Sequence, residues 1–434
     1  MFSKKLTDKP HCCDKIWIMK SVGCFLAITL LTSGLPEANA ETAALGRVRG
    51  RDVAAHGDEG VRFTCDRRQI REIKAGMADY LKSLDIPEEA VLLRERPAQG
   101  VLVYTLGTPA PETSTLDLAS RPAMGITDQV SLPLGGSSAA QVMTVSRKEI
   151  VLALLQHGRL TELKGAACSV DALADHVALR QNIVAWAETL RWGWPDGGPA
   201  QWNNDYWSRG TPKQGVSLRE ALDDAFVNQN AYAIGCYTAT KLVFVKGVMD
   251  YYDRVRESPT LARLIQTRLF SDRDPLSDIE PSKAWSFYPD FNPKDAHPGK
   301  LLSIIDEVAP KNFVPGDWVY FLNPDPVSSQ KVGYEGSNAI YLGGGRFDDY
   351  YAENNHAYTY AEKLDEVFQW RHGVFSRLRD AGKRQPLTDQ DLESLGTPPR
   401  HGGIVTDWRI GPNFFSAPVR HNTASRQQGP LDRS

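Results

Sequence analysis

The sequence predicts an α+β fold in which one helix packs against a small antiparallel sheet. The first observation is the stretch "AIGCYTATKLVFVKGVMD", residues 233–250, where apolar side chains recur at helical spacing after Cys236. The second is "PGDWVYFLNPD", which gives a Pro-Gly turn and a strand at residues 318–322. "GYEGSNAIYLGGG" follows as a strand closed by three glycines, and a third short strand is expected near residues 347–351.

Composition and charge are those of an ordinary globular protein. The 434 residues are 41% hydrophobic and 24% charged, which is enough material for one large or two medium domains. The 50 basic and 53 acidic residues leave a formal charge of −3. This balance lacks the basic footprint of a nucleic-acid-binding protein, so nucleic acid is not an expected partner.

The N-terminus has the pattern of a secretory leader. From Met19 the sequence "MKSVGCFLAITLLTSGLPEANA" has a basic start, an apolar run over residues 22–31 and small residues at 38–40. This pattern predicts a signal peptide with a possible N-terminal extension at residues 1–40, cleaved after Ala40. The apolar run is too short to span a bilayer and no later segment is long enough, so no integral membrane segment is expected after cleavage. A secreted or periplasmic protein is the resulting prediction.

The cysteine count indicates a free thiol. Once the leader is removed, Cys65, Cys168 and Cys236 remain. In an oxidising compartment an odd count is most simply explained by one disulfide and one free cysteine, which is then a candidate nucleophile. Cys65 and Cys168 both lie in the N-terminal half and are the candidate pair. Three buried, reduced cysteines are the open alternative.

The chain divides into segments of different character. Residues 41–60 lack an apolar period and are expected to be a flexible arm, and residues 61–178 are expected to form a mostly helical N-terminal domain. Residues 179–385 hold the helix and the sheet described above. Residues 386–434 are rich in Pro, Gly, Arg and Ser, which predicts an irregular tail.

Four tryptophans gather in the turn-rich stretch "RWGWPDGGPAQWNNDYW". Trp202 and Trp207 are candidate walls of a substrate-binding groove, because aromatic side chains on loops offer flat apolar surfaces. The alternative is that they cap a core.

Cys236 lies in the first turn of its predicted helix. Unpaired N–H groups and the positive end of the helix dipole favour thiolate over thiol, and the same N–H groups can hold an oxyanion during acyl transfer. A nucleophile helix followed by an antiparallel sheet is the papain-like arrangement. The alternative is that a small cysteine at a helix start is only a packing residue.

Three motifs carry a resemblance to a known family. "NAYAIGCYTATKLVFVKGVMD", "PGDWVYFLNPD" and "YEGSNAIYLGGGRF" resemble, in the same order, the bacterial protein-glutamine γ-glutamyltransferases, the small spore-coat transglutaminases of bacilli. "LRQNIVAWA", "NDYW" and "SLREALDDAF" are similar too, so the resemblance runs from about Leu179 to Phe375. It implies a papain-like fold, Cys236 as nucleophile, and protein substrates that bear Gln and Lys side chains. In this chemistry a thioester forms as ammonia leaves, and a lysine amine converts it into an isopeptide bond, with no metal or cofactor.

The chain departs from the family pattern where acidic residues are expected. Gly235 replaces a glutamate directly before the cysteine, and Ser337 replaces a glutamate before the second strand. The family's later histidine falls near Tyr350. Proton transfer therefore needs another group. Asp348 and Asp349, just before that position, are interpreted as ordinary turn formers.

Three residues are candidates for this missing role. Glu335 lies two positions before Ser337, and residues two apart on a strand share a face, so its carboxylate is expected in the same place. His356 follows the third strand, as a base would, and Asn338 would orient a base. Tyr334 and Ser337 complete the predicted site as substrate contacts. The plainer alternatives are a solvated strand end, an exposed loop histidine and a turn residue.

Two other functions are compatible with the sequence. If water instead of an amine resolved the thioester, the protein would be a deamidase or a cell-wall amidase. If the lost acidic residues were not replaced, the chain would be a catalytically inactive binding or structural relative that keeps Cys236 for packing.

Overall fold

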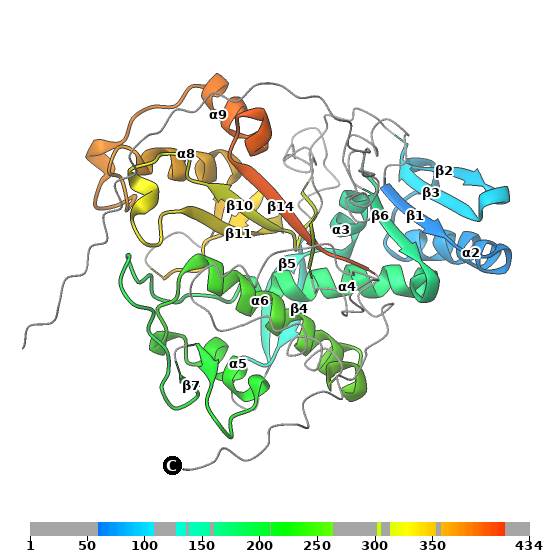
Figure 1. Ribbon diagram of the computed structural model, residues 1–434. Helices are drawn as coiled ribbons and strands as arrows, with labels where there is room; N and C mark the ends of the chain where they lie inside the picture. Colours follow the sequence, from blue (N-terminus) through cyan, green and yellow to red (C-terminus); the bar gives the residue numbers. More distant parts are fainter. Residues whose placement is uncertain are drawn as a thin grey trace, which may run out of the picture. The chain divides into compact units, whose positions relative to one another are not determined.

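Helix α6 (Cys236–Asp250) lies against a six-stranded antiparallel sheet at the centre of the fold (Figure 1). The computed structural model describes residues 60–107, 127–135, 139–156, 160–208, 210–263, 302–304, 313–352 and 357–412. The predicted leader, nearly all of the predicted arm and the candidate base His356 lie outside these residues.

The six-stranded sheet has the order β13-β12-β11-β10-β14-β9, and every neighbouring pair is antiparallel. Its strands are β9 (Leu302–Ile304), β10 (Trp318–Leu322), β11 (Gly336–Gly343), β12 (Arg346–Asp348), β13 (Ala357–Thr359) and β14 (Val405–Ile410). Strands β10, β11 and β12 correspond to the three strands that the sequence predicts. The α+β class, with a helix packed on an antiparallel sheet, is confirmed.

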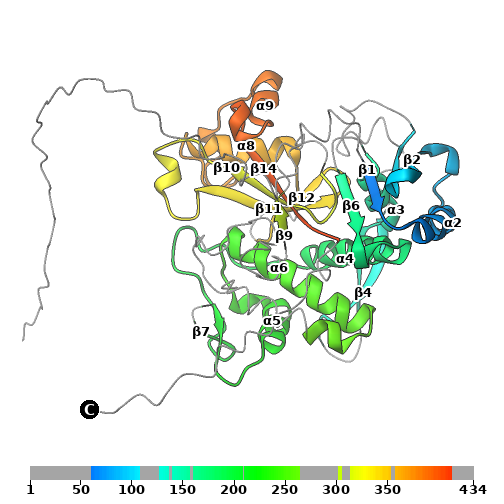
Figure 2. The same ribbon diagram turned by 45° about the vertical axis from the view of Figure 1, so that its right-hand side comes forward.

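Alternation along the central strands gives this sheet two buried faces. Trp318 of β10 and Ile340 of β11 face α6, whereas Val319 and Tyr341 face helix α8 (Tyr360–Trp370) on the other side. Successive side chains of a strand point to opposite faces, so a sheet between two helical layers needs apolar residues at consecutive positions. Strand β11 meets this need, because all eight of its residues are buried. Figures 1 and 2 show α6 and α8 on opposite sides of the sheet.

Helix α4 (Val170–Ala187) packs beside α6. Gly247 of α6 allows the close approach, because a Cβ there would lie 2.7 Å from the side chain of Ile183. Arg180 of α4 forms a buried ion pair with Asp317, in the turn before β10, at 2.9 Å. Helix α4 thus runs through the predicted domain boundary and ties together the segments on either side of it.

The N-terminal segment contains more strand than the sequence indicated. Helices α2 (Arg67–Ser83) and α3 (Arg147–Leu154) accompany a four-stranded sheet of order β2-β3-β1-β6 and a separate β4-β5 pair. The strands are β1 (Gly60–Thr64), β2 (Val91–Arg96), β3 (Val101–Leu106), β4 (Thr127–Leu132), β5 (Ala140–Val145) and β6 (Leu160–Lys164). Strands β2 and β4 are largely exposed and therefore give only a weak apolar period. The expectation of a mostly helical segment is corrected to a mixed arrangement of helices and strands.

The two cysteines of the predicted pair are joined in a disulfide. Cys65 lies directly after β1 and Cys168 shortly before α4, and their Cα atoms are 5.9 Å apart, which is an ordinary spacing for a disulfide. Cys236 is the free cysteine among the described residues. The covalent link holds the N-terminal sheet to the helix that packs on α6.

Residues 386–412 belong to the fold, so the prediction of an irregular tail from residue 386 is wrong for them. Strand β14 lies between β10 and β9 in the sheet, and helix α9 (Asp389–Leu395) contacts α8. The short apolar pattern of β14 is flanked by glycine and proline, and this composition hid the strand from the sequence analysis. Residues 413–434 lie outside the residues that the structure describes.

Helix α5 (Leu218–Val227) leads toward the N-terminus of α6. It follows a short pair of strands, β7 (Trp207–Ser208) and β8 (Thr211–Pro212). In the described part of the chain, no helix combines the length and the apolar character that crossing a membrane requires.

Candidate active site

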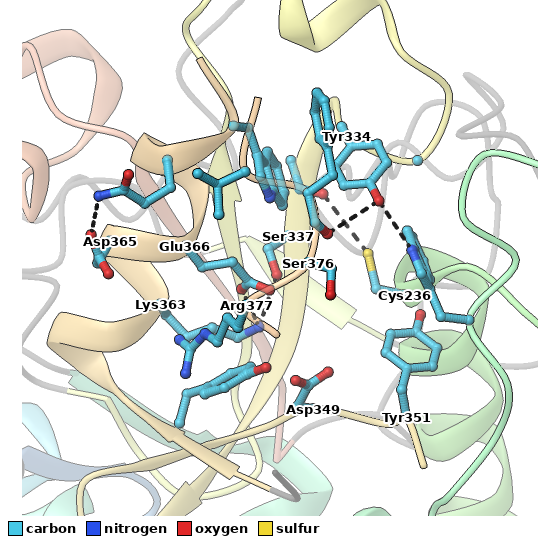
Figure 3. Close-up of a pocket in the computed structure, with 18 of the residues that line it drawn as sticks. Cys236, Tyr334, Ser337, Asp349, Tyr351, Lys363, Asp365, Glu366, Ser376 and Arg377 are labelled. Atoms are coloured by element: carbon cyan, nitrogen blue, oxygen red, sulfur yellow. Dashed lines mark hydrogen bonds and ion pairs between the residues drawn. The ribbon is translucent and has the colours of Figure 1, made fainter. Parts of the chain in front are cut away.

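Cys236 is the first residue of α6 and lies half-buried in the wall of a cleft (Figure 3). The residue before it, Gly235, is the N-cap and has no side chain that could cap the N–H groups of the first turn. These N–H groups are the feature that an acyl-transfer site can use for an oxyanion. The nucleophile that the sequence predicts therefore lies at an accessible helix end.

Asn338 of β11 is the direct neighbour of the thiol. Its backbone N–H lies 3.4 Å and its side-chain Nδ2 3.6 Å from Cys236 Sγ, and both donate to the sulfur. The Oδ1 atom of Asn338 accepts a hydrogen bond from Trp318 Nε1 at 2.9 Å, which fixes the orientation of the amide. The structure thus places Asn338 beside the nucleophile. Asn338 donates hydrogen bonds to the sulfur of Cys236 and does not accept the thiol proton.

Burial raises the pKa of the Cys236 thiol above its ordinary value. The two bonds from Asn338 and the ammonium of Lys363 act in the opposite direction, but burial outweighs them. At neutral pH the resting form is the thiol, contrary to the thiolate that the helix end alone predicts. The reaction therefore needs a group that removes the proton.

The opposite side of the cleft carries a buried lysine from α8. Lys363 Nζ donates to Ser337 Oγ at 3.0 Å and forms an ion pair with Glu366 at 2.8 Å. Although burial lowers the pKa of Lys363, the carboxylates of Glu366 and Asp349 raise it further than burial lowers it. Lys363 is therefore charged, and Ser337 is positioned by this lysine.

Asp349 follows β12 and is 4% exposed, so it is no ordinary surface turn former. Burial raises the pKa of Asp349 to about 6, and the Lys363 ammonium limits the rise. Its neighbour Asp348 is fully buried, and burial raises the pKa of Asp348 well above its usual range. The interpretation of these two residues as turn formers is therefore wrong.

The cleft combines these groups with aromatic walls. Its lining includes Cys236, Asn338, Ser337, Asp348, Asp349, Lys363, Glu366, Trp194, Tyr334, Tyr351, Trp370 and Phe375. Figure 3 shows Cys236 and Tyr351 on one side and Lys363 and Glu366 on the other. Among the described residues, no group of three or more His, Cys, Asp or Glu side chains is placed to hold a metal ion.

Tyr334 is part of this cleft, as predicted from the sequence. Its hydroxyl donates to Asp196 at 2.7 Å, and its ring packs edge-on against Trp194 and Phe375. The ring is therefore held rigidly as a wall of the cleft, with its polar end already bonded.

Glu335 does not reach the place that strand periodicity predicts. Its side chain is exposed, and its carboxylate accepts a hydrogen bond from Gly333 N–H at 2.9 Å. Strand β11 begins only at Gly336, so Glu335 lies in the preceding turn and does not share the face of Ser337. The prediction of Glu335 as the base is wrong for this reason.

Trp202 and Trp207 are core residues, and the prediction that they bind substrate is wrong. Their rings lie 4.9 Å apart in the interior, and Trp207 Nε1 donates to the backbone oxygen of Ala221 in α5 at 3.1 Å. Both rings lie outside the lining of the cleft. They support the segment that leads into α6.

The sequence analysis missed Asp349, Lys363 and Glu366. Lys363 and Glu366 are three residues apart on α8 and so share a face, which a helical assignment for that segment would have shown. For Asp349 the available signal was the run of aromatic residues that directly follows it, which indicates burial.

Comparison with known proteins agrees with this geometry. Residues 143–355 match the family model described as protein-glutamine gamma-glutamyltransferase. The matched segment includes Cys236, and this part of the chain is similar to that family. Proteins of this family are acyltransferases, and "transglutaminase" is used for them below.

Two curated transglutaminases illustrate the similarity. The protein-glutamine gamma-glutamyltransferase of Bacillus mycoides is 28% identical over 184 residues, which is 40% of this chain and 56% of that protein. The one from Bacillus cereus is 29% identical over 147 residues, which is 32% of this chain and 42% of that protein. The chain thus spans about half the length of these relatives.

A solved transglutaminase structure also matches. It is the transglutaminase from Geobacillus stearothermophilus (without C-terminal extension), with 19% sequence identity and a TM-score of 0.34. The match covers 57% of this chain and 98% of that one.

The transglutaminase resemblance implies a glutamate at two positions, Gly235 and Ser337, and the surroundings of these two positions differ from each other. At Gly235 an added Cβ would meet no atom within 4 Å, so the position is open space. At Ser337 the hydroxyl is bonded by Lys363, whose charge is opposite to that of the expected residue. The charge pattern around the thiol therefore differs from the one that the resemblance implies.

Proposed function

We propose that this protein is an exported transglutaminase that joins glutamine carboxamides to primary amines through a thioester on Cys236. The observation that carries the proposal is the placement of a free cysteine at the start of α6, bonded by Asn338 and facing an open cleft that holds carboxylates and an ammonium. The proposed substrates are proteins that bear Gln and Lys side chains.

The chemistry proceeds in two balanced halves. In the first, the sulfur of Cys236 adds to the carboxamide carbon, the C–N bond breaks, and ammonia leaves with the thiol proton. In the second, an amine adds to the thioester, the C–S bond breaks, and the sulfur recovers a proton from the amine. Splitting the transfer through a covalent intermediate replaces one difficult step by two easier ones. The N–H groups at the start of α6 would stabilise the oxyanion in both halves.

The test is amine incorporation into a glutamine-bearing peptide. The peptide is incubated with a fluorescent primary amine, and both the labelled product and the released ammonia are measured. Wild type should release one ammonia for each amine incorporated. The Cys236→Ala variant should do neither, and Cys236→Ser serves as the matched control that keeps the size of the side chain.

Three results would contradict the proposal in different ways. Ammonia release without amine incorporation would assign the protein as a deamidase or amidase. Incorporation that survives in Cys236→Ala would rule out the cysteine mechanism. No ammonia release by wild type on any glutamine peptide would favour an inactive binding or structural relative.

Export is supported by the disulfide and by the leader pattern. The Cys65–Cys168 bond is of the kind that persists in oxidising compartments. Expression of the full chain in a bacterial host, followed by fractionation and N-terminal sequencing, should yield a secreted or periplasmic protein that begins at Glu41. A cytoplasmic protein with an intact N-terminus would contradict export.

A further inference from the structure

We propose that Asp349 is the residue that takes and returns the protons of the Cys236 reaction. This inference rests on the function proposed above, and it assigns a role that the sequence motifs do not indicate.

The need for such a residue follows from the state of the thiol. Cys236 is protonated at rest, because burial raises its pKa. Ammonia is a poor leaving group unless it receives a proton, and an incoming amine must lose one. A single carboxylate that accepts and then releases a proton satisfies all of these steps.

Two other acidic residues of the cleft, Glu366 and Asp365, are already paired with cations. Glu366 holds Lys363 in an ion pair at 2.8 Å. Asp365 pairs with Arg384 and accepts a hydrogen bond from Gln369 at 2.7 Å. Both carboxylates neutralise cations, and protonation of Glu366 would leave the buried ammonium of Lys363 without its ion-pair partner.

Asp349 has the opposite character. It lines the cleft with only 4% of its surface exposed, and among the described residues its Oδ2 atom has no hydrogen-bond partner. A buried carboxylate oxygen without a partner is costly for stability, which is a mark of a group kept for another purpose. Figure 3 shows the carboxylate directed into the cleft between Lys363 and Tyr351.

The charges around Asp349 suit proton exchange near neutral pH. The groups that face it are Lys363 and Glu366 from α8, Arg377 from the loop after α8, Tyr358 from β13, and Asp348 and Tyr351 from its own segment. Together with burial they bring the pKa of Asp349 to about 6. A group whose pKa lies near the working pH is an effective acid and an effective base in turn.

The proton path is then explicit. Asp349 accepts the thiol proton as the sulfur of Cys236 attacks the carboxamide, and it gives this proton to the nitrogen as the C–N bond breaks. It next accepts a proton from the attacking amine and returns it to the sulfur as the C–S bond breaks. The transfers run through the reacting nitrogen or through one water molecule, so the carboxylate need not touch the sulfur.

The experiment compares Asp349→Asn with wild type on two substrates. On a glutamine peptide with hydroxylamine as acceptor, hydroxamate formation should fall about 100-fold or more, which is the usual contribution of a proton-transfer residue. On p-nitrophenyl acetate, the burst of nitrophenol should fall by a smaller factor than hydroxamate formation, because the thiol proton must still be removed but nitrophenolate leaves without a proton. Asp205→Asn is the matched control, because it makes the same change at an exposed aspartate outside the cleft, and it should behave as wild type on both.

A third readout does not depend on transferase activity. The rate of Cys236 alkylation by iodoacetamide is followed against pH, and wild type should show an inflection near pH 6 that Asp349→Asn lacks. Because alkylation also begins with loss of the thiol proton, the rate above pH 7 should be lower in Asp349→Asn than in wild type. A merely structural role would slow hydroxamate formation and the ester burst by the same factor.

The outcomes separate the two proposals. Hydroxamate formation by Asp349→Asn within about threefold of wild type would overturn the role of Asp349. Loss of the reaction in Glu366→Gln but not in Asp349→Asn would transfer the role to Glu366 and overturn it equally. If wild type forms no hydroxamate, the transglutaminase proposal fails by itself. In that case the alkylation profile decides, and a profile without the inflection in wild type overturns the inference.

Discussion

Lys363 Nζ lies 3.0 Å from Ser337 Oγ in the interior of the cleft, so a buried ammonium from α8 reaches across to the strand that also carries Asn338. This ammonium is balanced by Glu366 and Asp349, which raise its pKa. The nucleophile thus comes from α6, the ammonium and Glu366 come from α8, and Asp349 directly follows β12. Their positions depend on how α6 and α8 pack on the two faces of the same sheet.

Replacing Lys363 by Met should shift the pH dependence of the reaction. Lys363 lowers the pKa of Asp349, so its removal raises this pKa above about 6. Because the carboxylate form is the one that accepts the thiol proton, activity lost on acidification should then be lost at a higher pH than in wild type. The measurement is kcat/KM for a glutamine peptide across pH 5 to 8. An acidic limb that stays in place or moves to lower pH would contradict the assignment.

A double variant controls for folding in this test. Lys363→Met alone leaves Glu366 unpaired, and breaking a buried pair costs about 3 kcal/mol or more. Adding Glu366→Gln removes the second charge and should recover most of that loss in urea unfolding. Glu366 itself raises the pKa of Asp349, so the shift should be smaller in the double variant than in Lys363→Met. If the double variant folds as well as wild type and its acidic limb still lies at a higher pH, the shift belongs to Asp349 and not to partial unfolding.

Two substitutions at Asn338 should separate thiol reactivity from stability. Asn338→Ala removes the Nδ2 donor to the sulfur and leaves Trp318 Nε1 buried without an acceptor, which should cost about 1–3 kcal/mol. Asn338→Asp keeps that acceptor but places a negative charge at Cys236. The alkylation rate at pH 7 should fall in the order wild type, Ala, Asp, because each change raises the thiol pKa. Stability should instead rank wild type and Asp above Ala, and identical rankings in the two assays would contradict this account.

The sequence predicted the helix and the strand at the centre of the fold because the residue patterns that mark them are local. The apolar period after Cys236 gave α6, and the turn residues around residues 318–322 gave β10. Strand β14 was missed because its pairing is with β10, far away in the chain, and its own sequence is short and flanked by glycines. Strand β2 was missed because an exposed edge strand has no apolar face to detect.

The sequence predicted site residues only where a single short motif contains them. Cys236 and Asn338 lie in motifs, and the structure brings them together. Asp349 and Lys363 could not be paired from the sequence, because their proximity depends on α8 covering the face of the sheet opposite α6. Glu335 shows the limit of periodicity, since a strand that starts one residue later changes which side chain faces the cleft.

The contact between α4 and α6 should tolerate no added methyl group. Gly247→Ala would place a Cβ 2.7 Å from the Ile183 side chain and 2.8 Å from its Cα, so the helices must separate. Overpacking of this kind costs about 1–3 kcal/mol, measured as a lower urea midpoint. Gly382→Ala is the matched control, because a Cβ there meets nothing within 4 Å. Equal midpoints for the two variants would contradict the close packing.

The buried pair of Arg180 and Asp317 should be the strongest single polar tie between α4 and the sheet. Arg180 also donates to the backbone oxygens of Pro315 and Ile410, and Asp317 accepts from Val314 N–H at 2.9 Å. Arg180→Met leaves the Asp317 carboxylate buried without its cation, which should cost about 3–5 kcal/mol in urea unfolding.

The control for this pair is an exposed one. Arg68 and Glu72 form an ion pair on the surface of α2, and Arg68→Met should leave the midpoint unchanged because water screens such pairs. Since Arg180 contacts both the turn before β10 and the end of β14, its loss should also lower the cooperativity of unfolding between α4 and the sheet. Hydrogen exchange of β10 and β14 amides should then speed up in Arg180→Met but not in Arg68→Met. Equal exchange in both variants would show that apolar packing alone holds α4 in place.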